Sequence, residues 1–310
     1  MSLRIRTNVM SLVAQRHFGE SGSRVKKHME RLSSGHRINK SADDAAGLAI
    51  SESIRSDVRS LAQARRNTVD GVSLIQVAEG SLNEIGSIVI RLKELAIQGA
   101  SDNIGSRERG YLNLEFMQLK DEIDRISLST EFNGTRLLTG KSENLPEPIL
   151  EKHQFPPYEI QVGKDYHELT DSLDLDNPVN IIRLNFESLN SMTDGENSLG
   201  IGSPANEEGT RVDSKVAAQN SIRILDEAVN KLSSYRATLG SLQNRLEATD
   251  RNLGIRIENL SAGRSRIIDA DFANETAEYT QWNILNQAGA SVLTQANQLP
   301  QVALQLLQNT

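Results

Sequence analysis

The chain has 310 residues, of which 37% are hydrophobic but only 4% aromatic, a balance that suits long packed helices better than an aromatic-rich core. It contains no cysteine, which excludes disulfides and thiolate metal sites, and no apolar run approaches the length of a membrane span. The net charge of −7 is unevenly spread, because residues 1–40 carry nine Lys and Arg against two Glu and are therefore +7.

The N-terminal part predicts an amphipathic terminal helix followed by a very long one. Gly35 suits the end of the first helix, and Ser41 is expected to cap the next, with Asp44 at the capping-box distance. This long helix, expected over residues 42–98, carries a heptad seam whose spacing alternates three and four, as packing against another helix requires. The seam consists of Leu61, Ala64, Thr68, Gly71, Ile75, Ala78, Leu82, Ile85, Val89, Leu92 and Ala96.

A further helix is expected over residues 106–130, ending at a turn formed by Asn133 and Gly134. Six of the seven prolines then fall between residues 141 and 208, which indicates a central non-helical insert. Within the insert, residues 158–163 and 180–186 alternate as short strands do.

The C-terminal part returns to a helical pattern. Its last 32 residues, 279–310, hold no charged side chain. Soluble monomers rarely expose so neutral a surface, which is rich in Leu, Ala and Gln, whereas a polymer could bury it. Before this segment, leucines recur every seven residues over six heptads, which predicts one packed face of a helix bundle: Leu225, Leu232, Leu239, Leu246, Leu253 and Leu260.

An enzyme housed in the insert is one alternative class. His167 and Glu168 begin the zinc-protease pattern H-E-x-x-H, but Asp171 stands where the second histidine is needed. Without that imidazole and a third ligand, a zinc site is disfavoured. We therefore expect no catalysis, no metal and no cofactor.

Nucleic-acid binding by the basic first 40 residues is a second alternative. Their Arg and Lys are scattered, and Phe18 is the single aromatic among them, so this function is also disfavoured. Asp269 and Asp271 are better explained as helix caps than as an acid–base pair. His17, His28 and His36 lack ligand spacing on one face and are expected at the surface or in an interface.

Two terminal stretches resemble the ends of bacterial flagellin, the filament subunit of the flagellum. They read LSSGHRINKSADDAAGLAIS at residues 32–51 and SRIIDADFANETAEYTQWNILNQAGASVLTQANQLPQVALQLL at residues 265–307. The resemblance covers residues 3–140 and 211–307, and further blocks occur in the order in which the family has them: 8–15, 66–80, 130–134 and 239–245.

The resemblance implies a mainly α fold, with a long helical-bundle rod, terminal coiled-coil helices and a small β-containing insert. Residues 1–40 and 271–310 would pair as the coiled coil of the filament core, residues 41–140 and 209–270 would form the rod, and residues 141–208 the insert of the outer rod. Polymerisation would depend on apolar residues of both terminal helices, namely Leu3, Ile5, Val9, Leu12, Leu285, Val292, Leu299 and Leu306.

The same resemblance implies a non-catalytic subunit that polymerises with itself, alone or with sibling flagellins, into the filament used for swimming. It implies an extracellular location reached through the flagellar export apparatus without a cleavable signal peptide. A secretion chaperone and the hook-associated and cap proteins would be partners. The alternative is a hook–filament junction protein with flagellin-like ends, against which the complete blocks 67–80 and 240–245 favour flagellin.

A host partner is implied as well. Arg91, Leu95 and Glu115 match positions of the surface by which the family is recognised by the animal toll-like flagellin receptor, whereas Ile90 and Lys93 replace the usual Gln and Arg. Receptor binding is therefore an expectation that rests on part of that surface.

Overall fold

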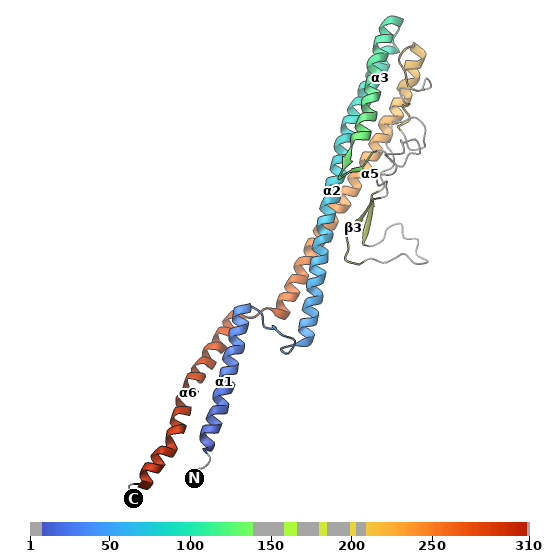
Figure 1. The fold of residues 1–310 in the computed structure, drawn as a ribbon. Coiled ribbons are helices and arrows are strands. Elements are labelled where there is room, and N and C mark those ends of the chain that lie inside the picture. Colours follow the sequence, from blue (N-terminus) through green and yellow to red (C-terminus); the bar gives the residue numbers. More distant parts are fainter. Residues whose placement is uncertain (1–7, 139–157, 166–179, 185–198, 203–208, 309–310) are drawn as a thin grey trace, which may run out of the picture. The chain divides into compact units, whose positions relative to one another are not determined.

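The computed structural model describes residues 8–138, 158–165, 180–184, 199–202 and 209–308, with the backbone alone for 299–308. The described helices are α1 (Val9–Ser34), α2 (Ala45–Gly99), α3 (Ser106–Ser129), α5 (Lys215–Ile268) and α6 (Phe272–Gln308) (Figure 1). The described strands are β1 (Glu131–Phe132), β2 (Thr135–Arg136), β3 (Tyr158–Gln161) and β4 (Ile181–Leu184). The mainly α fold with a small β-containing insert is thus confirmed.

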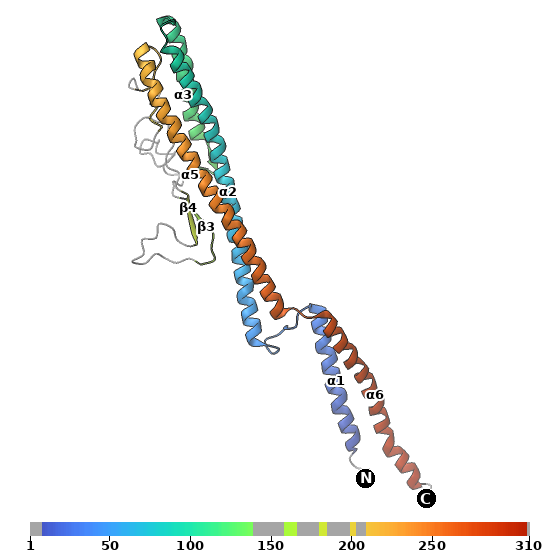
Figure 2. The same cartoon turned by 180° about the vertical axis from the view of Figure 1, so that it is seen from behind.

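The chain divides into two compact units, residues 1–58 with 258–310 and residues 59–257. In the second unit, α2, α3 and α5 lie side by side (Figure 2) and share one apolar core. All eleven positions of the predicted seam on α2 are buried. Leu225, Leu232, Leu239, Leu246 and Leu253 of α5 are buried as well, which confirms the seven-residue ladder within this unit.

Ion pairs fix the direction in which α2 and α5 pack. Lys93 pairs with Asp226 at 2.5 Å and Arg65 pairs with Asp250 at 2.8 Å. A residue further along α2 therefore pairs with a residue nearer the start of α5, which shows that the two helices are antiparallel. Because both pairs are largely exposed, they set register more than they add stability.

The start of α2 differs from the expectation. Asp44, not Ser41, is the capping residue, because its Oδ1 atom accepts a hydrogen bond from the Gly47 N–H at 2.9 Å. Residues 41–43 form a turn ahead of the helix, in which the carboxylate of Asp43 is held by Lys27 at 3.1 Å. The end of α1 lies where the sequence predicts it. Gly35 is the capping residue, with a φ of 71°, and its N–H donates to the Arg31 carbonyl.

Both small sheets are two-stranded and antiparallel. The Asn133–Gly134 turn joins β1 to β2 with φ angles of 50° and 76°, as its residue types predict. Strand β3 pairs with β4 and packs on α2, where a side chain at Gly71 would collide with Ile160. A larger residue at position 71 would therefore require the end of the Ile160 side chain to move.

Candidate polymerisation surface

In the first unit, α1 and α6 run antiparallel and side by side (Figures 1 and 2). Each helix turns a heptad face toward the other. On α1 this face holds Ser11, Ala14, Phe18, Ser21, Val25 and His28, and on α6 it holds Glu275, Tyr279, Trp282, Asn286, Gly289, Leu293 and Ala296; all are buried or half-buried. We call these residues the terminal seam. Its small members let the helices approach closely, since a Cβ atom at Gly289 would lie 3.5 Å from Phe18.

A charged cluster lies at one end of the terminal seam. Glu275 accepts hydrogen bonds on both carboxylate oxygens, from Arg31 at 2.9 Å and from the His28 ring at 2.5 Å. Burial by itself raises the pKa of Glu275, but the hydrogen bonds from His28 and Arg31 and the Arg31 charge outweigh it, so the pKa lies below its ordinary value. Glu275 is therefore a buried carboxylate that joins α6 to two residues of α1.

Other polar contacts complete this end. The Asp271 side chain accepts from the backbone N–H of Ala273 at 3.0 Å, which confirms its expected role as a helix cap. Backbone hydrogen bonds tie the segments that enter the two helices, because Arg37 donates to the Ile268 carbonyl and Ala270 donates to the Gly35 carbonyl. About two turns along α6 from Glu275, the Arg24 guanidinium lies 5.5 Å from the centre of the Trp282 ring.

Beside the terminal seam, the pair leaves apolar side chains uncovered. Of the predicted polymerisation residues, Val9 is 56% exposed, Leu12 57%, Leu285 45% and Val292 59%. None of these four belongs to the seam, so they do not hold α1 to α6. Leu3 and Ile5 lie outside the described residues, and Leu299 and Leu306 lie on α6 where the side chains are not described.

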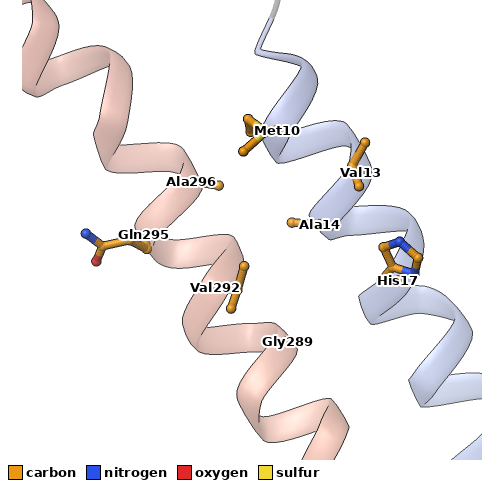
Figure 3. A pocket seen from close by; sticks show the side chains of 8 residues that line it. All are labelled: Met10, Val13, Ala14, His17, Gly289, Val292, Gln295 and Ala296. Carbon is orange, nitrogen blue, oxygen red and sulfur yellow. The ribbon is translucent and has the colours of Figure 1, made fainter. Parts of the chain in front are cut away.

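Part of this surface is hollowed into an apolar groove between the two helices (Figure 3). The groove has a volume of about 430 Å³. Small residues form its floor, where Ala14 and Ala296 point toward each other, and larger ones flank it. The lining residues are Met10, Val13, Ala14 and His17 of α1 and Gly289, Val292, Gln295 and Ala296 of α6.

The expected receptor surface is only partly at the surface of the bundle. Arg91 and Glu115 are exposed and form an ion pair at 2.9 Å that joins α2 to α3. Leu95 is instead buried in the core beneath them. In this fold Arg91 and Glu115 are accessible to a partner and Leu95 is not.

Sequence reasoning found the exposed apolar positions but missed the terminal seam. The seven-residue spacing of Leu285 and Val292 is the more obvious pattern on α6, yet the buried face is the neighbouring one. That face contains Glu275, Asn286 and Gly289, which no hydrophobic periodicity detects. The available signal was the alternating three-and-four spacing that also links Tyr279, Trp282, Leu293 and Ala296 on this face.

Paired terminal helices with uncovered apolar faces, joined in one chain to a helical bundle with its own core, define a helical structural protein. The family "Bacterial flagellin N-terminal helical region" matches residues 5–143, and "Bacterial flagellin C-terminal helical region" matches residues 222–307. The chain belongs to the bacterial flagellin family.

Known relatives agree with this assignment. The flagellin of Halalkalibacterium halodurans is 40% identical over 303 residues, which cover 98% of this chain and 99% of that protein. The flagellin of Bacillus subtilis is 40% identical over 318 residues, covering 98% and 100%. A putative flagellar hook-associated protein from Vibrio parahaemolyticus has a solved structure that matches 73% of this chain and 100% of its own with a TM-score of 0.56. Because the two sequences are only 13% identical, this likeness shows a shared fold and nothing more.

Proposed function

We propose that this flagellin is the non-catalytic structural subunit of a helical flagellar filament used for swimming, and that α1 and α6 carry its polymerisation. The observation that supports this most directly is the uncovered apolar surface of the terminal pair, which includes Val9, Leu12, Leu285 and Val292. Contact with other copies of the chain would remove this surface from water.

The free energy gained by burying these apolar side chains favours assembly. Full burial of one aliphatic side chain of this kind contributes about 1.5–3 kcal/mol, and each subunit offers several. A groove on one copy that receives a different surface of the next copy makes a heterologous contact, and such contacts extend into open helical polymers.

A hook-associated protein is less well supported. The likeness to the Vibrio protein concerns the fold, whereas two flagellins are 40% identical to nearly the whole of this chain. The two assignments differ in copy number, since a filament subunit greatly outnumbers a junction protein in isolated flagella.

An enzymatic role has no support among the described residues. They contain no group of three or more side chains suited to a metal ion, and His167, Glu168 and Asp171 lie outside them. Burial lowers the pKa of Lys120 to about 8, but this amine is buried and donates to the Thr210 carbonyl at 3.2 Å, a structural contact.

The remaining partners follow from family membership. We propose export through the flagellar export apparatus with a chaperone on the C-terminal helix, contact with hook-associated and cap proteins at the filament ends, and an extracellular location. Recognition by the toll-like flagellin receptor would use Arg91 and Glu115. Over the described residues, no helix is apolar enough for long enough to cross a bilayer.

Replacing Val292 with aspartate tests the proposed surface. The side chain is 59% exposed and lines the groove, so the change should leave the subunit folded while placing a charge in the contact with the next copy. We expect no filaments at concentrations where the wild type polymerises from seeds, and unchanged helix content by circular dichroism.

Val216→Asp is the matched control, because Val216 is 67% exposed on α5 in the other unit. It should polymerise as the wild type does. Normal filament growth by Val292→Asp would show that the groove is not part of the polymerisation surface.

A further inference from the structure

The helix α6 contains a proline that leaves one of its carbonyl groups without a helical partner. Pro300 lies within α6 and has no backbone N–H. In an α-helix the residue at this position would donate to the carbonyl four residues earlier, which belongs to Ala296. Ala296 is buried in the terminal seam, where water cannot readily replace the missing donor and an unpaired carbonyl is costly.

The side chain of Asn8 supplies that donor from the other helix. Its Nδ2 atom donates to the Ala296 carbonyl at 2.8 Å. Its Oδ1 atom accepts from the Ser11 N–H at 3.1 Å, which caps the start of α1. The two bonds also fix the amide orientation, since a flipped amide would set donor against donor and acceptor against acceptor.

A second contact stands beside the first. The Ser11 hydroxyl donates to the Asn297 side chain at 2.7 Å. Asn8 and Ser11, three residues apart at the start of α1, thus meet the adjacent residues Ala296 and Asn297 of α6. Sliding one helix by a single turn would break both contacts and leave the Ala296 carbonyl unpaired again.

We propose that Asn8 is a positioning residue that sets the register of α1 against α6, by capping α1 and by completing the hydrogen bond that Pro300 removes from α6. This role rests on the proposed function, because the register places Met10 and Val13 across the groove from Val292. Asn8 therefore acts on polymerisation through the shape of the groove.

The chemistry requires an amide at position 8. Aspartate caps a helix as well as asparagine does, but its carboxylate cannot donate and would face the Ala296 carbonyl. Serine also caps a helix and adds no charge, but its shorter side chain cannot reach both partners. A residue that only caps α1 would tolerate either change.

A double-mutant cycle separates the two roles, with full-length wild type, Asn8→Asp, Pro300→Ala and the double variant. The readout is the critical concentration for seeded polymerisation. The proposal predicts that Asn8→Asp raises it about tenfold, the effect of leaving one buried carbonyl unpaired. With Pro300→Ala, position 300 gains an N–H that pairs with the Ala296 carbonyl, so the same change should then cost about twofold or less. Asn8→Ser should show the same rescue without a change in charge.

The outcomes are distinct. An equal loss for Asn8→Asp in both backgrounds, with the same result for Asn8→Ser, would overturn the register role and leave Asn8 a simple cap. Failure of Pro300→Ala alone to polymerise would also overturn it, because the added N–H should satisfy α6 by itself. If the wild type fails to polymerise, the proposed function is what fails.

Discussion

Replacing Glu275 with alanine should raise the critical concentration for filament assembly by roughly a hundredfold. The change leaves His28 and Arg31 without their partner at a buried site, and breaking a buried ion pair on one side costs about 3–5 kcal/mol. We expect the lower end of this range because the Arg31 side chain is 20% exposed to solvent in the wild type. Seeded polymerisation at neutral pH, followed by light scattering, measures the effect.

Glu278→Ala is the control, one turn further along α6. Glu278 accepts a hydrogen bond from Trp282 of its own helix at 3.1 Å, so its loss should cost about 1 kcal/mol or less. Similar critical concentrations for the two variants would contradict the account of the Glu275 cluster.

The same cluster predicts a dependence on acid. Because the pKa of Glu275 is lowered in the folded pair, its contribution is complete above the ordinary value of 4.5 and is lost as the pH falls through the folded value. Glu275→Gln, which cannot titrate, should therefore polymerise less well than the wild type at neutral pH and lose less of its remaining assembly in acid.

Replacing Phe116 with alanine should lower the free energy of unfolding of the monomer by about 3–5 kcal/mol. The ring is fully buried in the shared core of the bundle, and closely packed cores relax only partly around the cavity that such a change leaves. Guanidinium unfolding followed by circular dichroism measures the loss.

Leu114→Ala, two residues away on α3, is the matched control because Leu114 is 65% exposed. Its effect should stay within about 0.5 kcal/mol. A loss below about 1 kcal/mol for Phe116→Ala would mean that α3 does not complete the core of this unit.

The sequence predicted the bundle well because its seams are apolar. Residues such as Leu82 and Leu239 combine the right spacing with an obvious hydrophobic character, and burial follows. The hairpin turn at Asn133 was equally accessible, since few residue types adopt positive φ.

The terminal pair was harder to predict because several of its buried contacts are polar. His28 and Glu275 are buried through their contact with each other, and each alone reads as a surface residue. The Asn8 side chain donates to a carbonyl that Pro300, without a backbone N–H, cannot pair. This contact becomes visible only when the two helices are placed side by side. The choice between Ser41 and Asp44 as the cap of α2 depended on a turn that local pattern did not specify.

The most direct test of the central claim compares the full chain with a variant lacking residues 1–40 and 271–310. Both are seeded at equal concentration and examined by negative-stain electron microscopy, with circular dichroism to confirm that the truncated bundle is helical. We predict long helical filaments from the full chain and none from the truncated one. Filaments from the truncated chain would contradict the proposal that α1 and α6 carry polymerisation, and monomers from the full chain would contradict its role as a filament subunit.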